Sequence, residues 1–170
     1  METNTRYWIT VVSKDHLVNG IAGGFMQANH GKAGPLKRIQ KNDWIIFYSP
    51  KQTYAGSVPC QAFTAIGRAV DDDVYQHKMS EDFVPYRRNV EFYQCRDTPI
   101  APLVNDLDFI TNKKSWGYPF RVGFFEIQAD DFELIRFEMI KYPLATLNNN
   151  QIIIKSTCYD KHQFENIARY

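Results

Sequence analysis

The chain has 170 residues, of which 44% are hydrophobic, and its 20 Lys and Arg residues nearly balance 19 Asp and Glu residues. This length and composition fit one globular domain of ordinary size, and a net charge of +1 excludes a surface that binds nucleic acid through overall positive charge. Three widely spaced cysteines argue against a disulfide scaffold, and no apolar run is long enough to span a membrane. We therefore expect a cytoplasmic protein.

Residue patterns predict short strands and helices in a mixed order. In chain order they indicate a strand (6–13), a helix (14–24), one helical turn (34–39), three strands (42–49, 62–70 and 84–94), a helix (101–110), a strand (120–128) and a helix (130–141). Ser13 occupies the N-cap position of the first helix, whose apolar face would comprise Leu17, Val18 and Ile21. Gly67 inside a strand indicates a bulge or a close approach.

This order does not alternate strand and helix as a doubly wound protein does. It favours an α+β fold in which a mixed sheet curls into a small barrel flanked by short helices. The sequence changes character after Tyr142, where we expect a loop (143–151), an edge strand (152–156) and a last helix (159–170). We therefore predict one domain over residues 1–142 and an extension over 143–170 that packs on it.

Motifs for common enzymes are absent from the sequence. Gly31-Lys32 resembles the end of a phosphate-binding loop, but Met26 stands where such a loop needs Gly and Ala33 where it needs Ser or Thr. The four histidines are scattered, and no paired Cys or His motif indicates a metal site. No G-x-S-x-G elbow occurs, and the cysteines lack a catalytic signature. We predict a non-catalytic protein that needs no metal and no cofactor.

Three segments resemble the EVE domain family: "GGFMQANHGK" (23–32), "PLKRIQKNDWIIFYSPK" (35–51) and "FTAIG" (63–67). The resemblance runs from about Tyr7 to Met139 in the motif order of that family. EVE domains belong to the PUA-like superfamily, as YTH and ASCH domains do. The resemblance therefore implies a PUA-like mixed β-pseudobarrel flanked by short helices. YTH domains hold methylated adenine of RNA in an aromatic cage, so the resemblance also implies a reader of modified bases in DNA or RNA.

By position, a YTH-like pocket would lie between the first strand, the first helix with its following loop, and the sheet. The residues that would line it are Val12, Ser13, His16, Gly24, Phe25, Gln27, His30, Tyr48, Ser49 and Trp116. Phe25 stands where YTH sequences carry the tryptophan of "GVW", so Phe25 would form one wall of the cage and Trp116 a second. Gln27 and His30 would read the base edge.

Cations near this position would form a rim for phosphates, which position a nucleic acid without reading its sequence. The residues of this rim would be Lys32, Lys37, Arg38, Lys51, Arg87 and Arg88. The same residues could instead form a solvated charged face. Two other functions stay open at this point. An aromatic pocket also suits a sensor or carrier of a small planar metabolite or nucleotide, and a weak hydrolase is the third reading.

Overall fold

The computed structural model describes residues 5–140, 145–148 and 151–154. The chain divides into two compact units, residues 1–139 and 140–170. In the second unit, β9 (Ala145–Asn148) and β10 (Gln151–Ile154) pair as an antiparallel hairpin. A strand thus forms in the segment expected to be a loop, and the edge strand expected from residue 152 begins one residue earlier. The helix expected over 159–170 lies outside the described residues.

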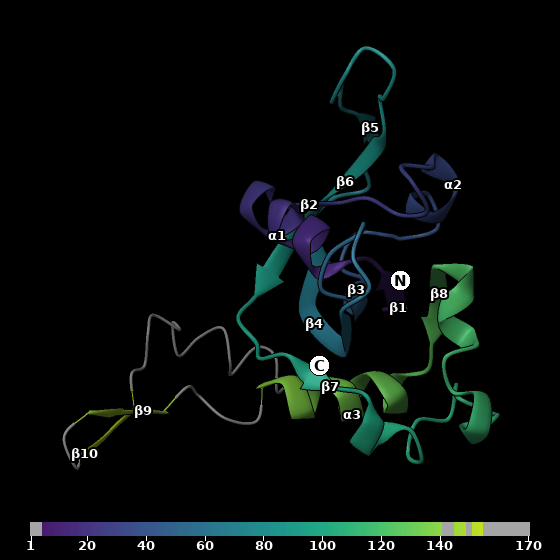
Figure 1. Cartoon of the computed structure of the whole chain (residues 1–170). Coiled ribbons are helices and arrows are strands. Elements are labelled where there is room, and N and C mark those ends of the chain that lie inside the picture. Colours follow the sequence, from purple (N-terminus) through teal and green to yellow (C-terminus); the bar gives the residue numbers. More distant parts are fainter. Residues whose placement is uncertain (1–4, 141–144, 149–150, 155–170) are drawn as a thin grey trace. The chain divides into compact units, whose positions relative to one another are not determined.

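One eight-stranded sheet organises the first unit, with the central order β2-β6-β4-β3-β1-β8 (Figure 1). The strands are β1 (Tyr7–Val11), β2 (Phe25–Met26), β3 (Trp44–Lys51), β4 (Pro59–Ala69), β5 (Tyr75–Gln76), β6 (Tyr86–Tyr93), β7 (Thr98–Pro99) and β8 (Phe124–Ile127). β5 pairs with β6, and β7 pairs with β4. β1 runs parallel to β3, whereas the other pairs of this sheet are antiparallel. The expected α+β fold with a curled mixed sheet is confirmed.

Short helices flank the sheet. They are α1 (Lys14–Gly23), α2 (Ala33–Leu36) and α3 (Ala129–Ile140), with 3-10 helices η1 (Ala101–Leu103), η2 (Lys113–Ser115) and η3 (Pro119–Val122). None of the helices in the described part of the chain is long and apolar enough to cross a membrane.

The face by which α1 packs differs from the predicted one. Leu17 is buried, but Val18 and Ile21 are 57% and 44% exposed. The helix instead packs through Leu17 and Gly20, because a Cβ at Gly20 would lie 2.7 Å from the carbonyl oxygen of Phe25. Ser13 does precede the helix, but its hydroxyl makes no capping hydrogen bond. Glycine therefore sets how closely α1 approaches the start of β2.

Two predicted elements of the C-terminal half are shorter than expected. The predicted helix over 101–110 is the 3-10 turn η1 followed by further turns, in which Leu103, Leu107 and Ile110 are buried. The predicted strand over 120–128 forms only as β8, because η3 occupies its first residues and Gly123, with φ of +76°, ends η3. The core lies inside the curl of the sheet and includes Trp8, which is completely buried.

Candidate ligand-binding site

The pairing of β2 with β6 sorts the predicted residues onto two faces. Phe25 lies opposite Asn89, and Met26 lies opposite Arg88. Side chains alternate between the two faces of a strand, and both Met26 and Arg88 are 1% exposed. Arg87 and Asn89 therefore share the opposite face with Phe25. We call this the outer face, made of Phe25, Tyr75, Arg87 and Asn89, since Tyr75 of β5 lies opposite Arg87.

A cation–π stack occupies the centre of the outer face. The guanidinium carbon of Arg87 lies 3.7 Å from the centroid of the Phe25 ring. The edge of the same ring lies against the end of α1, where a Cβ on Gly23 would be 2.5 Å from its Cε1 atom. Phe25 is thus at the position predicted for a cage wall, but one face of its ring already holds a guanidinium.

Arg87 is 8% exposed, and its Nε is buried without a hydrogen-bond partner. Among the described residues, no hydrogen bond or ion pair reaches any nitrogen of its side chain. The neighbouring Asn89 is fully engaged: its oxygen accepts from the Tyr75 hydroxyl at 3.0 Å, and its nitrogen donates to the Asp71 carboxylate at 2.8 Å. Asp71 therefore supports the outer face through Asn89.

The loop that follows β2 connects the outer face to the hairpin of β5 and β6. The Gln27 side-chain nitrogen lies 3.6 Å from the sulfur of Met79 in that hairpin, as a weak hydrogen bond. The carbonyl oxygen of Gly31 accepts from the backbone N–H of Tyr86 at 2.9 Å. His30 is exposed and has a left-handed backbone, with φ of +61°. The loop is therefore anchored to β6 while Gln27 and His30 keep side chains near the surface.

The predicted residues from β1 and α1 lie mostly in structural roles. Val12 is half-buried against the core, and Ser13 is buried. Gly24 ends α1 with φ of +65°, and its N–H bonds to carbonyls of the last helical turn. His16 is exposed and stacks on Tyr54, with ring centroids 5.0 Å apart. Of these four residues, only His16 presents an exposed side chain.

The predicted residues Tyr48, Ser49 and Trp116 have partners of their own. Tyr48 is 2% exposed and stacks on Phe120 at 3.9 Å, and burial raises its pKa to about 12. Ser49 is completely buried and shares a 2.7 Å hydrogen bond with Thr64. Trp116 is half-buried and meets Phe120 edge-on at 6.5 Å. No ring contact among the described residues joins this cluster to Phe25, so the two predicted cage walls are not brought together.

Only some of the residues expected to form a phosphate rim are exposed. Arg88 is 1% exposed, and its guanidinium donates to the carbonyl oxygens of Leu36 and Asp71. Its predicted exposure is therefore wrong, because the register of β6 turns this side chain into the protein. Lys51 is half-buried and donates to the carbonyl oxygen of Tyr54 at 3.2 Å.

The remaining predicted cations form what we call the basic segment, residues 32–41. It carries four exposed cations and no acid: Lys32, Lys37, Arg38 and Lys41. None of the four belongs to an ion pair among the described residues. Arg38 covers Trp8, with its guanidinium carbon 4.9 Å from the ring centroid. Lys41 was not among the predicted residues, although an acid-free run of cations in the sequence is the signal that would have included it.

A separate hollow of about 200 Å³ lies between β7, η1 and α3, lined in part by Thr98, Leu103 and Glu138. This is the end of the sheet away from β5 (Figure 1). It includes none of the predicted site residues. In the described part of the chain, no three His, Cys, Asp or Glu side chains come together in a way that could hold a metal ion.

Comparisons with known proteins agree with the sequence and the fold. The family model of the EVE domain matches residues 6–137. A UPF0310 protein of Mycolicibacterium vanbaalenii is 52% identical over 133 residues, which cover 78% of this chain and 92% of that protein. The UPF0310 protein in the gntR 5' region of Bacillus licheniformis is 50% identical and covers 76% of this chain and 88% of that protein. A hypothetical protein from Leishmania major, only 10% identical, has the same fold, with a TM-score of 0.50 over 80% of this chain and 95% of that chain. The chain therefore belongs to the EVE domain family.

Proposed function

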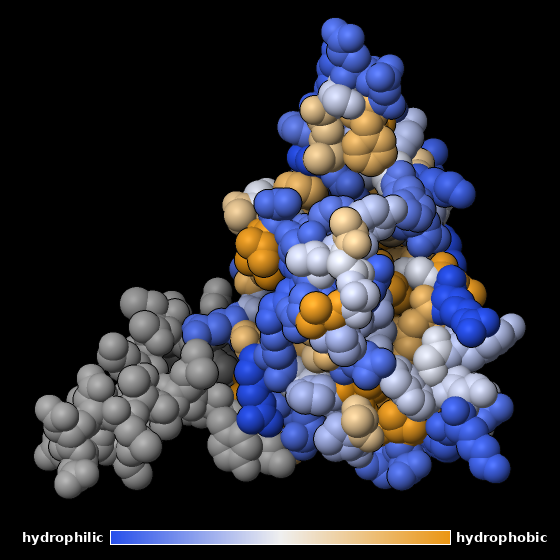
Figure 2. Space-filling view, viewed as in Figure 1, coloured by the Kyte–Doolittle hydropathy of each residue, from blue (hydrophilic) through white to orange (hydrophobic). Residues whose placement is uncertain are grey.

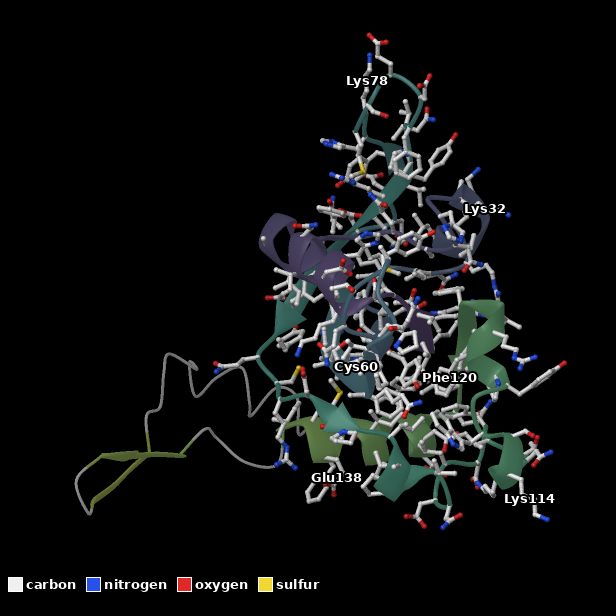
Figure 3. The ribbon with its side chains drawn as sticks, in the orientation of Figure 1. Lys32, Cys60, Lys78, Lys114, Phe120 and Glu138 are labelled. Atoms are coloured by element: carbon white, nitrogen blue, oxygen red, sulfur yellow. The ribbon has the colours of Figure 1, made fainter. Side chains whose placement is uncertain are left out.

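We propose that this chain is a nucleic-acid-binding module that captures a modified base on its outer face and holds the adjoining phosphates on its basic segment. The membership of the EVE family and the curled mixed sheet support a binding role. The observation that carries the proposal is the position of the basic segment. It begins at Lys32, which is labelled in Figure 3, directly after the loop that follows Phe25 and Met26 of β2.

The charge of this segment distinguishes a nucleic acid from a small planar metabolite. The whole chain carries a net charge of only +1, yet four cations that form no ion pair among the described residues lie within ten consecutive residues. Unpaired Lys and Arg side chains in a row suit a chain of phosphates, because each neutralised phosphate releases counterions. A single free metabolite would use one or two of these cations. The distribution therefore favours a polymer with several phosphates.

The outer face supplies contacts that suit a base. A planar base can stack beside the Phe25–Arg87 pair, and stacking contributes roughly 1–3 kcal/mol per base. The Gln27 amide offers both a donor and an acceptor for a base edge, and its contact with a methionine sulfur is weak enough to be exchanged. Extruding a base from a duplex costs a few kcal/mol, so this module favours a base that is already unpaired. No step of this binding requires catalysis.

Matched lysine variants test the proposal. We would measure binding of a fluorescent single-stranded oligonucleotide that carries a panel of modified bases, across a series of salt concentrations. Lys37→Gln removes a cation of the basic segment, and Lys114→Gln removes an exposed cation of η2, elsewhere on the molecule (Figure 3). We expect Lys37→Gln to weaken binding and to lower the slope of log affinity against log salt by roughly 0.7, while Lys114→Gln changes neither.

Two other outcomes would contradict the proposal. Equal weakening by both variants would mean that the oligonucleotide contacts the protein without using the basic segment in particular. Equal affinity for the oligonucleotide and for the free modified nucleoside would favour a sensor or carrier of a small planar metabolite, because the phosphates would then contribute nothing.

A further inference from the structure

We propose that Arg87 contacts the ligand directly and that the ligand presents two hydrogen-bond acceptors side by side to its guanidinium. Where that ligand is a base, the inference rests on the proposed function. It starts from a comparison of two neighbouring residues, Arg87 and Arg88. Both are more than nine-tenths buried, and the Nε of each has no hydrogen-bond partner among the described residues, but only Arg88 has described partners for its terminal nitrogens.

Arg88 shows how this chain bonds the terminal nitrogens of a buried guanidinium, although its Nε, like that of Arg87, has no partner among the described residues. Its two terminal nitrogens donate to the carbonyl oxygens of Leu36 and Asp71, and the second also lies 3.4 Å from the Asp72 carboxylate. Arg87 has no equivalent contact among the described residues. The one carboxylate that supports the outer face, that of Asp71, bonds to Asn89 instead.

A buried guanidinium donor without a partner is costly for the free protein, and the Nε of Arg87 is such a donor. Desolvating a charged donor without a hydrogen bond costs more than leaving a neutral one unsatisfied. A buried polar group without a partner in a native structure therefore needs a reason, and one such reason is a ligand that completes its hydrogen bonds. Arg87 and Arg88 each have such an Nε, but of the two only Arg87 also lacks any hydrogen bond from its terminal nitrogens to the described residues.

The stack on Phe25 determines what kind of ligand can complete the bonds. The guanidinium carbon lies over the ring, 3.7 Å from its centroid, and a guanidinium donates hydrogen bonds in its own plane, around its edge. An arginine edge matches groups that offer two parallel acceptors, as carboxylates and phosphates do. The O6 and N7 atoms of guanine present the same pair. A base that carries a positive charge, or whose acceptor pair is blocked by methylation, would be rejected by repulsion or by the missing acceptor.

The test uses the full chain and three probes: guanosine, 7-deazaguanosine, which lacks the N7 acceptor, and inorganic phosphate. Each would be titrated into the wild-type protein, Arg87→Lys and the control Arg121→Lys by calorimetry. Arg121 is a matched control because it is an exposed arginine whose guanidinium also lies over an aromatic ring. Its guanidinium carbon is 5.7 Å from the centroid of the Tyr118 ring. Lysine keeps the charge but loses the two-donor edge. Thermal unfolding of each variant would confirm that it is folded.

Two results would support the inference and identify the source of the acceptors. If guanosine binds about 5- to 100-fold more tightly than 7-deazaguanosine, and Arg87→Lys loses that difference, the acceptors are those of a base edge. If inorganic phosphate binds and Arg87→Lys loses it, the acceptors are those of an oxyanion. Phosphate binding without any binding of nucleosides or oligonucleotides would leave this inference standing while the proposed function fails.

The inference is overturned if Arg87→Lys binds every probe as the wild-type protein does. It is also overturned if removing the guanidinium strengthens binding of guanosine, since Arg87 would then only block the ring of Phe25. The comparison of guanosine with 7-deazaguanosine on the wild-type protein needs no variant. Equal affinity for these two probes, together with no phosphate binding, overturns the inference even if Arg87→Lys does not fold.

Discussion

Replacing Asp43 with alanine should destabilise the fold strongly, because this carboxylate ties β1 to the turn before β3. Asp43 is 1% exposed. One of its oxygens accepts from the backbone N–H of Arg6 at 3.0 Å, and the other accepts from the indole of Trp8 and the backbone N–H of Gln40, both at 2.9 Å. The parallel pairing of β1 and β3 begins beside these contacts, at Tyr7 and Trp44.

The expected magnitude follows from the three donors that the change leaves behind. An unsatisfied buried donor costs about 1–3 kcal/mol, and the indole of Trp8 is completely buried. The other two donors are partly buried and regain some water, so we assign about 1 kcal/mol to each. The total is about 3–5 kcal/mol, a large part of the roughly 5–15 kcal/mol of an ordinary domain. Asp43→Asn should cost less, because its amide oxygen can still accept from some of the three donors.

Urea denaturation of the wild-type protein, Asp43→Ala and Asp43→Asn, monitored by fluorescence, measures these differences in the free energy of unfolding. A loss of 4 kcal/mol would also lower the melting temperature by roughly 8–16 °C for a chain of this size. Asp106→Ala is the control, since Asp106 is exposed and surface changes of this kind stay within about 0.5 kcal/mol. If Asp43→Ala lost less than about 1 kcal/mol, the reasoning from its hydrogen bonds would be refuted.

Three further predictions concern single positions. Gly31→Ala should lower the free energy of unfolding by roughly 2–4 kcal/mol, because φ at Gly31 is +79° and the added Cβ would overlap Pro85. Gly34→Ala is the control and should change this free energy little, because there is open space around Gly34. Thermal unfolding would measure both variants. Burial raises the pKa of Cys95 to about 11, so little of this thiol is ionised at pH 8. We therefore expect iodoacetamide to label Cys95 far more slowly in the native chain than in urea, as measured by mass spectrometry. Equal labelling rates would contradict this prediction. Burial raises the pKa of Tyr48 to about 12, whereas an unfolded tyrosine has a pKa near 10. Between pH 10 and pH 12 the unfolded chain therefore loses this proton before the folded chain does, so the free energy of unfolding falls over that interval. The urea midpoint should fall over that interval, and by less in Tyr48→Phe.

The elements that sequence reasoning found are those with a strong local signal. The runs of β-branched and aromatic residues around Ile9, Ile46 and Ile66 predicted β1, β3 and β4, and those residues are completely buried. The predicted close approach at Gly67 is confirmed, because a Cβ there would lie 2.5 Å from the Cγ1 atom of Val90. In these places the side chains themselves decide the structure.

The elements that sequence reasoning missed form through pairing with distant parts of the chain. β2 and β5 have two residues each and exist because both pair with β6. The Val90 N–H donates to the carbonyl oxygen of Gly24 at 2.9 Å, a bond that no local pattern around residue 24 signals. The site shows the same limit. Trp116 was expected to form a cage wall with Phe25, but it packs on Phe120 because η3 places that ring beside it.

The two adjacent arginines show why this limit matters for function. In the sequence, Arg87 and Arg88 are indistinguishable cations, and both were assigned to the same phosphate rim. The register of β6 separates them, because a shift of one residue would exchange the faces of every side chain in the strand. That register is fixed by the pairing of Met26 with Arg88 and by the lack of a Cβ at Gly67, which lets Val90 approach. Arg88 thereby bonds to Leu36 and Asp71 within the fold, and Arg87 lies beside Phe25 with no hydrogen bond from its side chain to the described residues. A mutation that shifted the register would therefore abolish the proposed site without touching either arginine.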